Sequence, residues 1–311
     1  MKKLVILVAF SMLFCSCART KNTIDDGQLS IVTTIFAPYD LARQIAGDKA
    51  EVTMLLKPGS ESHSFEPTPQ DIIRIQNCDL FIYVGGESET WVNDILNSMN
   101  DAQFKVVRLM DCVEVVEEEI VEGMEEEEKH GENAEYDEHV WTYPVNVKNI
   151  VSDITAALCS IDEANMDYYN ISFMDYSSKL DELDEAFTGV TDPARIARNV
   201  IVFGDRFPFR YFADGYGLNY YAAFPGCSTE TEPSAATLKF LIDKVNQEQI
   251  PVVFYIELSN HKIADAICEA TGAKALQLHC AHNISAEEFE NGATYYDIMK
   301  ANVDSLKEAL G

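Results

Sequence analysis

Residues 29–111 alternate between two kinds of hydrophobic pattern. Short runs rich in β-branched and aromatic residues lie at 30–35, 51–56, 80–84 and 105–109. Stretches with helical spacing of apolar residues separate them. Strands that alternate with helices pair in parallel, because each crossover helix brings the chain back in the same direction. This part of the chain is therefore predicted to form one α/β lobe around a parallel sheet.

The same alternation returns in the last third of the chain. Strands are predicted at 199–203, 218–224, 252–256 and 273–278, and helices at 233–246, 261–271 and 295–310. Between the two halves, residues 146–187 contain no Gly or Pro and carry apolar residues at helical spacing. They predict a long linking helix, with a break at 160–165. The expected fold class is α/β, with two parallel-sheet lobes joined by a rigid helix and a metal site in the cleft between them.

The pattern divides the chain into five parts. We expect a signal peptide at 1–17, a tether at 18–28, a first lobe at 29–145, a linking helix region at 146–195 and a second lobe at 196–311. After the second strand, Thr68-Pro69-Gln70-Asp71 is a strong helix start, because Thr68 can cap the helix and Pro69 suits its first position. The loop at 57–67 is thus fixed at one end.

The first residues have the order of a secretory signal. Lys2 and Lys3 precede an apolar run at 4–14, which is too short to span a bilayer, and small residues follow. Cys17 after Ser16 resembles a bacterial lipobox, which would make Cys17 a lipidated first residue and anchor the protein to the membrane. An ordinary cleaved signal is the alternative. Both place the mature protein outside the cytoplasm, on the periplasmic or cell-surface side.

The net charge indicates which kinds of partner the protein can bind. A formal net charge of −29 argues against nucleic acid or anionic lipid and favours a cationic solute. Six widely scattered cysteines follow the signal without a CxxC pair, so the sequence indicates neither a disulfide-dense scaffold nor a thiolate zinc knuckle. A single bridge, such as Cys78 to Cys112, stays open.

Residues 114–138 form a strongly acidic segment. Thirteen of the twenty-five are Asp or Glu against one Lys, which is too much self-repulsion for a core element. We expect a mobile loop here. It is either a solubilising insertion or a segment that collects cations near a site, and the pattern does not choose between them.

Candidate ligands follow the predicted strands, where open parallel sheets bind their ligands. His63 lies in the loop at 57–67, His139 lies where the acidic segment ends, and His279 ends the last strand. Three imidazoles with one carboxylate or water suit tetrahedral zinc. His282, which follows His279 in a turn, is the reserve ligand. His130 lies within the acidic segment, and His261 begins a predicted helix.

Two carboxylates also follow strands. Asp205 could bind the metal or support a ligand, or it could pair with Arg206 or Arg210. Glu257 could act as an alternate ligand or outer support, or could cap the following helix. The residues alone leave these roles open.

The ordered series of motifs resembles the periplasmic zinc and manganese solute-binding family of ABC importers, sometimes called cluster A-I. The segments that carry the resemblance are 57–69, 137–141 with Pro144 and Asn146, 209–213 with 216–218, and 231–234. The resemblance implies two lobes fixed by a helix, one metal in the cleft, and release to a membrane permease. It also implies that His63 and His139 are ligands from the first lobe.

The chain departs from the family pattern at two positions. Relatives carry a third ligand His after the first strand of the second lobe, where Arg206 stands here, and an acidic ligand where His279 stands. We expect the exchange to preserve three imidazoles and one carboxylate, with Asp205 as the latter. Many relatives also carry a histidine-rich loop, whereas this loop is rich in Glu. Three imidazoles favour Zn²⁺ over Mn²⁺, which prefers more oxygen ligands.

The expected function is therefore extracytoplasmic capture of Zn²⁺ by a monomer and its delivery to an ABC importer permease. A manganese-specific protein of the same family is the alternative. A secreted zinc hydrolase with Glu257 as general base is disfavoured, because no HExxH or GxSxG motif is present. An adhesin lipoprotein is disfavoured by the absence of repeats or a large apolar stripe in the sequence.

Overall fold

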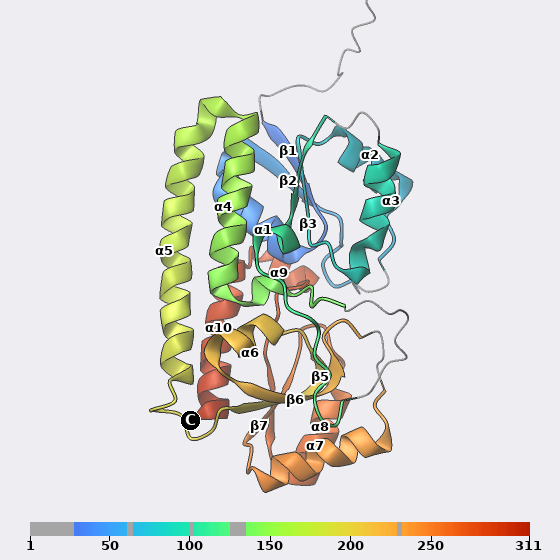
Figure 1. The fold of residues 1–311 in the computed structure, drawn as a ribbon, viewed down its shortest axis with the longest axis vertical. Coiled ribbons are helices and arrows are strands. Elements are labelled where there is room, and N and C mark those ends of the chain that lie inside the picture. The colour runs from blue at the N-terminus through green and yellow to red at the C-terminus, as the bar shows by residue number, and fades with distance from the viewer. Residues whose placement is uncertain (1–27, 61–64, 100–102, 125–134, 229–231) are drawn as a thin grey trace, which may run out of the picture.

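Two four-stranded parallel sheets lie one above the other along the long axis of the molecule, with long helices along one side (Figure 1). The computed structural model describes residues 28–60, 65–99, 103–124, 135–228 and 232–311. The predicted signal peptide and Cys17 lie outside these ranges, as do His63 and residues 125–134. No helix of the described residues is long and apolar enough to cross a membrane.

The first lobe has the strand order β2-β1-β3-β4. The strands are β1 (Leu29–Thr33), β2 (Ala50–Met54), β3 (Leu80–Tyr83) and β4 (Lys105–Arg108). All pairs are parallel, as the alternating pattern predicted. Every residue of β3 is buried because this strand lies inside the sheet with helices on both faces. The carboxyl ends of the strands, and the loops after them, therefore share one edge.

The helices of this lobe are α1 (Phe36–Ala46), α2 (Pro69–Asn77), α3 (Thr90–Ser98) and α4 (Pro144–Ile161). The predicted start of α2 is confirmed. The Thr68 hydroxyl accepts from the Asp71 amide at 3.3 Å, and the Asp71 carboxylate accepts from the Thr68 amide at 3.0 Å. This reciprocal pair satisfies two amides that the first helical turn leaves without partners.

The second lobe has the strand order β6-β5-β7-β8. The strands are β5 (Val200–Phe207), β6 (Asn219–Pro225), β7 (Val252–Tyr255) and β8 (Lys274–Gln277). The helices are α6 (Arg210–Tyr216), α7 (Ala235–Gln247), α8 (Lys262–Thr271), α9 (Ala286–Glu290) and α10 (Tyr295–Leu310). All strand pairs are again parallel.

Strand β5 is longer than the prediction of 199–203. Its pairing with β6 shifts register between Phe203 and Arg206, and the strand then continues to Phe207. Gly204 lies at this irregularity, where a Cβ atom would come within 2.5 Å of the Ala264 backbone. Because of this extension, Asp205 and Arg206 belong to the strand and not to the loop that follows it.

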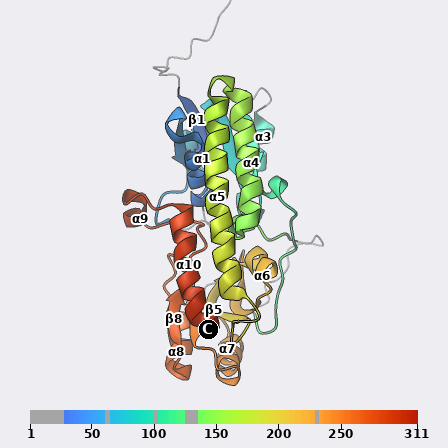
Figure 2. The ribbon, with the colours of Figure 1, turned by 90° about the vertical axis from the view of Figure 1, so that its left-hand side faces the viewer.

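The predicted linking helix is a pair of helices with the expected break between them. Helix α4 ends at Ile161, a short turn follows at Glu163–Asn165, and α5 (Met166–Thr191) runs back alongside α4 (Figure 2). Helix α4 packs on the first lobe, so α5 alone continues to the second. There Phe187 packs against the rings of Phe212 and Tyr216 at centroid distances of 4.8 and 5.6 Å.

The largest apolar core runs through both lobes. It contains fully buried aromatic side chains from the first lobe, the linking helices and the second lobe, including Phe36, Trp141, Tyr169, Phe212 and Tyr295. A shared core restricts movement of one lobe against the other. The six described cysteines are free, so the Cys78 to Cys112 bridge that the sequence left open is not formed.

Candidate metal-binding site

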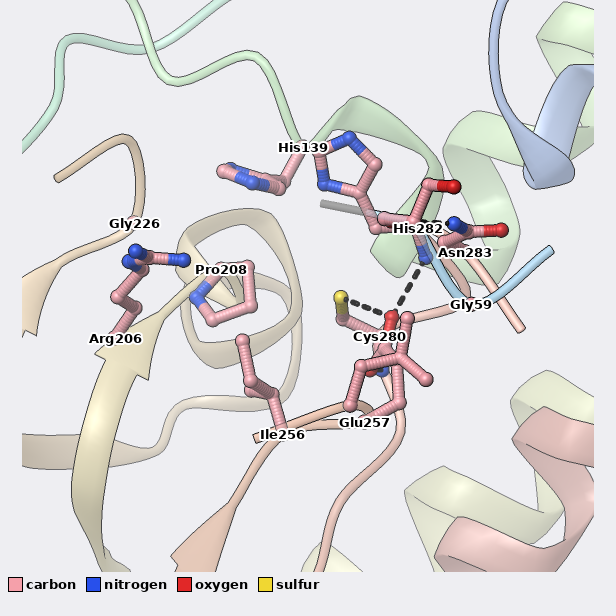
Figure 3. A pocket seen from close by; sticks show the side chains of 12 residues that line it. Gly59, His139, Arg206, Pro208, Gly226, Ile256, Glu257, Cys280, His282 and Asn283 are labelled. Carbon is pink, nitrogen blue, oxygen red and sulfur yellow. Dashed lines mark hydrogen bonds between the residues drawn. The ribbon is translucent and has the colours of Figure 1, made fainter. Parts of the chain in front are cut away.

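A cavity of about 190 Å³ lies where the strand ends of the two lobes meet (Figure 3). The first lobe contributes Gly59, Ser60 and His139 to its lining. The second lobe contributes Arg206 near the end of β5 and residues that follow β5, β6, β7 and β8, namely Pro208, Gly226, Ile256, Glu257, Leu258, Cys280, His282 and Asn283. Both lobes must be in place for this cavity to exist.

His139 is buried and held by its neighbour Asp137. The Asp137 carboxylate oxygen Oδ1 lies 3.0 Å from His139 Nδ1 and also accepts from the His139 backbone amide at 2.8 Å. Burial lowers the pKa of His139, but the carboxylates of Asp137, Glu138 and Glu118 together outweigh it and leave that pKa raised. A proton on Nδ1, directed at Asp137, leaves the Nε2 lone pair for a metal ion.

His282 brings a second imidazole to the same cavity. Its ring centroid lies 5.7 Å from that of His139, at an interplanar angle of 70°, and Trp141 packs against both rings. The backbone of His282 is held from two sides, because its amide donates to Glu257 Oε1 at 2.9 Å and its carbonyl accepts from the Phe36 amide at 3.1 Å. The two imidazoles therefore come from different lobes to one place.

The Glu257 carboxylate organises the loop that carries His282. It accepts from the Cys280 amide at 2.7 Å, from the Cys280 thiol at 2.9 Å and from the His282 amide. Burial and the nearby Glu257 charge raise the pKa of Cys280 well above the ordinary value. The Cys280 thiol thus acts as a hydrogen-bond donor to Glu257.

His279 does not line the cavity. Its Nδ1 accepts from the Ala281 amide at 3.0 Å, and its Nε2 lies 3.9 Å from Glu288 Oε1 on α9. Asn302 of α10 bonds both the amide and the carbonyl of His279. Ala281 has a φ of +59°, so the chain turns sharply between the two histidines. This turn brings His282, and not His279, beside His139.

Asp205 also lies apart from His139. It lines a neighbouring cavity of about 150 Å³, and its oxygens accept from the backbone amides of Arg206 at 2.8 Å and Ile256 at 3.3 Å. Burial raises the pKa of Asp205. Within the ranges that the structure describes, no three side chains of His, Cys, Asp or Glu converge closely enough to hold a metal ion. His63 lies outside those ranges.

The ends of the acidic segment are anchored on the second lobe. Glu117 pairs with Tyr136 in a short antiparallel bridge, and the Tyr211 hydroxyl donates to the Asp137 carbonyl at 2.7 Å. Glu118 accepts from the Cys227 amide at 2.9 Å, and Glu119 pairs with Arg210. The expectation of a mobile loop is therefore wrong for residues 114–124 and 135–138. Residues 125–134 lie outside the ranges that the structure describes.

The partner of His139 was not singled out from the sequence. The sequence analysis included Asp137 only as part of the motif at 137–141. The one signal that could have identified it as the partner of His139 was its place, as an acidic residue two positions before a candidate ligand. The contribution of Trp141 was likewise not predicted. Its indole nitrogen donates to the Cys280 carbonyl at 2.8 Å, which ties the first lobe to the loop that carries His282.

Known proteins are similar to this chain in both sequence and fold. The family model for zinc-uptake complex component A, periplasmic, matches residues 31–309. The high-affinity zinc uptake system protein ZnuA of Bacillus subtilis is 33% identical over 99% of this chain and 97% of its own length. The zinc-binding lipoprotein AdcA of Streptococcus pneumoniae is 29% identical over 99% of this chain, but this chain spans only 61% of that relative.

A solved structure shows the same arrangement of lobes. The Zn(II)-bound ZnuA-like domain of Streptococcus pneumoniae AdcA superimposes with a TM-score of 0.76 at 27% identity, covering 91% of this chain and 99% of that domain. The predicted fold class, with two parallel-sheet lobes and a long linking helix, is confirmed. The match over nearly the whole chain and the two-lobed fold establish that this protein belongs to the family of periplasmic zinc-uptake complex component A proteins.

Proposed function

We propose that this protein captures Zn²⁺ outside the cytoplasm and delivers it to the permease of an ABC importer. The observation that carries the proposal is the pair of buried imidazoles, His139 and His282, which come from different lobes to one cavity. Neutral imidazole is the commonest protein ligand for zinc, whereas manganese prefers oxygen. The similarity to zinc-uptake and zinc-binding relatives supports the same cargo.

The proposed protein ligands are His63, His139 and His282. His63 rests on the family resemblance alone, since it lies outside the described residues. His282 takes the place that we expected for His279, because the turn at Ala281 directs it to the cavity. Glu257 supports the His282 loop through three accepted hydrogen bonds. No group in this arrangement is given a catalytic role.

We also propose where the protein acts in the cell. A lipid on Cys17 would hold the protein at the outer surface of the membrane, beside the permease, and the protein would act there as a monomer. The signal-like order of residues 1–17 supports export. Mass spectrometry of the protein from a bacterial membrane fraction tests the anchor. A lipid on Cys17 would add its mass to the natural protein, and the Cys17→Ala variant would lack this added mass.

The first test of the function is calorimetric titration with Zn²⁺ and with Mn²⁺. We expect one site that binds Zn²⁺ more tightly than Mn²⁺, because two or three imidazoles bind the softer ion better. Equal or tighter binding of Mn²⁺ would favour the manganese alternative. No binding of either ion would contradict capture of a transition metal by this cavity.

Replacing Asp137 by Ala is expected to weaken Zn²⁺ binding by roughly 10- to 100-fold, the usual cost of losing a group that orients a ligand histidine. The change removes the acceptor for His139 Nδ1 at 3.0 Å and leaves the ring free to turn. Chelator-competition titration measures the effect. Glu138→Gln is the matched control, because this equally buried carboxylate bonds Ser88 and not His139. An equal loss in both variants would contradict a specific positioning role for Asp137.

A further inference from the structure

The loop that follows β2 brings its backbone to the proposed metal cavity. Gly59 and Ser60 of this loop line the cavity together with Asn283 of the second lobe (Figure 3). None of residues 57–60 is fully buried, so side-chain packing contributes little to holding them in place. His63, a proposed ligand, comes three residues after Ser60 in the chain. The position of this short segment therefore affects how the site is completed.

The buried side chain of Asn283 ties this segment to the second lobe. Its amide nitrogen donates to the Lys57 carbonyl at 3.0 Å and to the Ser60 carbonyl at 2.7 Å. Its oxygen Oδ1 accepts from the Ile284 backbone amide at 2.8 Å, so both donors and an acceptor are in use. The Gly59 amide adds a third bond between the lobes, because it donates to the Ile284 carbonyl at 2.7 Å.

Asn283 thereby joins the segment at 57–60 to the turn that carries His282. Asn283 directly follows His282, whose ring centroid lies 5.7 Å from that of His139. The planar peptide bond between Asn283 and His282 transmits a displacement of one residue to the other. A metal ion that fixes His282 would therefore also fix Asn283 and the two carbonyl groups to which it donates.

We propose that Asn283 is a positioning residue for zinc capture, which holds the segment at 57–60 against the metal site and slows the release of the bound ion. The held backbone forms one wall of the cavity and keeps the chain that leads to His63 at the site. Without Asn283, the carbonyl groups of Lys57 and Ser60 would bond to water, and the segment could leave the wall. This inference rests on the proposed zinc function and assigns Asn283 a role other than that of a ligand.

Asn283→Ala tests the proposal, with Asn302→Ala as the matched control. Both asparagines are 3% exposed, but the Asn302 side chain bonds the amide and the carbonyl of His279 within the second lobe. In a stopped-flow assay with a chelator that takes up released zinc, Asn283→Ala should release zinc roughly 10- to 100-fold faster than the natural protein. Asn302→Ala should leave the release rate nearly unchanged, although urea unfolding should show a similar loss of stability. An equal increase of the release rate in both folded variants would overturn the inference.

Hydrogen exchange of the Gly59 amide in the metal-free protein reports on the segment itself. In Asn283→Ala this amide should exchange roughly tenfold faster or more, because two of the bonds that hold the segment are lost. Asn283→Asp should act in the same way, since it removes both donors and keeps the acceptor for the Ile284 amide. Undiminished protection of Gly59 in both folded variants would overturn the inference. If the natural protein bound no zinc, the proposed function and the role in release would both fail, whereas the exchange would still show whether Asn283 holds the segment.

Discussion

Replacing His282 by Ala is expected to lower the affinity for Zn²⁺ by more than roughly 100-fold, beyond the 10- to 100-fold cost of losing a supporting group. The reason is geometric. His282 lines the interlobe cavity with its ring 5.7 Å from that of His139, and no other histidine of the described second lobe lines it. Removing it leaves the second lobe without an imidazole at the site.

His279→Ala is the matched control for this prediction. His279 is buried to a similar degree, but its ring Nδ1 accepts from the Ala281 amide, and it does not line the cavity. We expect less than about a tenfold change in zinc affinity, with a stability loss of roughly 1–3 kcal/mol from the unpaired Ala281 amide. Chelator competition and urea unfolding on both variants separate the two effects. A larger loss of zinc affinity in His279→Ala than in His282→Ala would reverse the assignment.

The fold was predictable because its signals are local and repeated. Each lobe alternates β-rich runs with helical spacing, and the capping pair of Thr68 and Asp71 marks a helix start from four residues alone. The extension of β5 to Phe207 was not predictable from such signals. It depends on Gly204 lying against the Ala264 backbone on α8, which is a contact between distant parts of the chain.

The site was predictable only in outline. The rule that ligands lie beyond strand ends led to His139, Glu257 and the region of His279 and His282. It placed His279 ahead of His282. The feature that brings His282 to the cavity is the turn with a positive φ at Ala281, held by the three hydrogen bonds that Glu257 accepts. The turn and these bonds arise from tertiary contacts that leave no pattern in the residues around them.

The acidic segment shows the limit of reasoning from composition. Its charge predicted a loop without fixed contacts, yet its described ends are held by cations and hydroxyl groups of the second lobe. Arg210 pairs with Glu119, and the Tyr220 hydroxyl donates to the same carboxylate at 3.1 Å. Arg210 and Tyr220 lie about a hundred residues further along the chain. Composition within one segment carries no information about such partners.

Replacing Glu89 by Gln is expected to remove a pH dependence of stability worth about 3 kcal/mol. Glu89 is buried and lines a small separate cavity that His282 also lines, and burial raises its pKa from 4.5 to about 7. In the unfolded chain the same carboxyl has its ordinary pKa. The folded protein therefore binds more protons than the unfolded chain between about pH 4.5 and 7, and the contribution of Glu89 to stability falls as the pH rises through this window.

The Gln side chain suits this position. The amides of Val84 and Gly85 both donate to one carboxylate oxygen of Glu89, at 2.7 and 2.9 Å, and the amide oxygen of Gln can accept both. No charge then has to be buried at neutral pH. We expect the variant to gain stability relative to the natural protein between pH 5 and pH 8, as measured by urea unfolding at each pH.

Glu87→Gln is the control for this titration, because Glu87 lies in the same short turn but is exposed. It should shift stability by the same small amount at pH 5 and pH 8. The stability difference between Glu89→Gln and the natural protein could instead be constant from pH 5 to pH 8. This result would mean that Glu89 is ionised in both the folded and the unfolded protein. The two amides that donate to Glu89 would then offset the cost of its burial, and this buried carboxylate would carry a full negative charge at neutral pH.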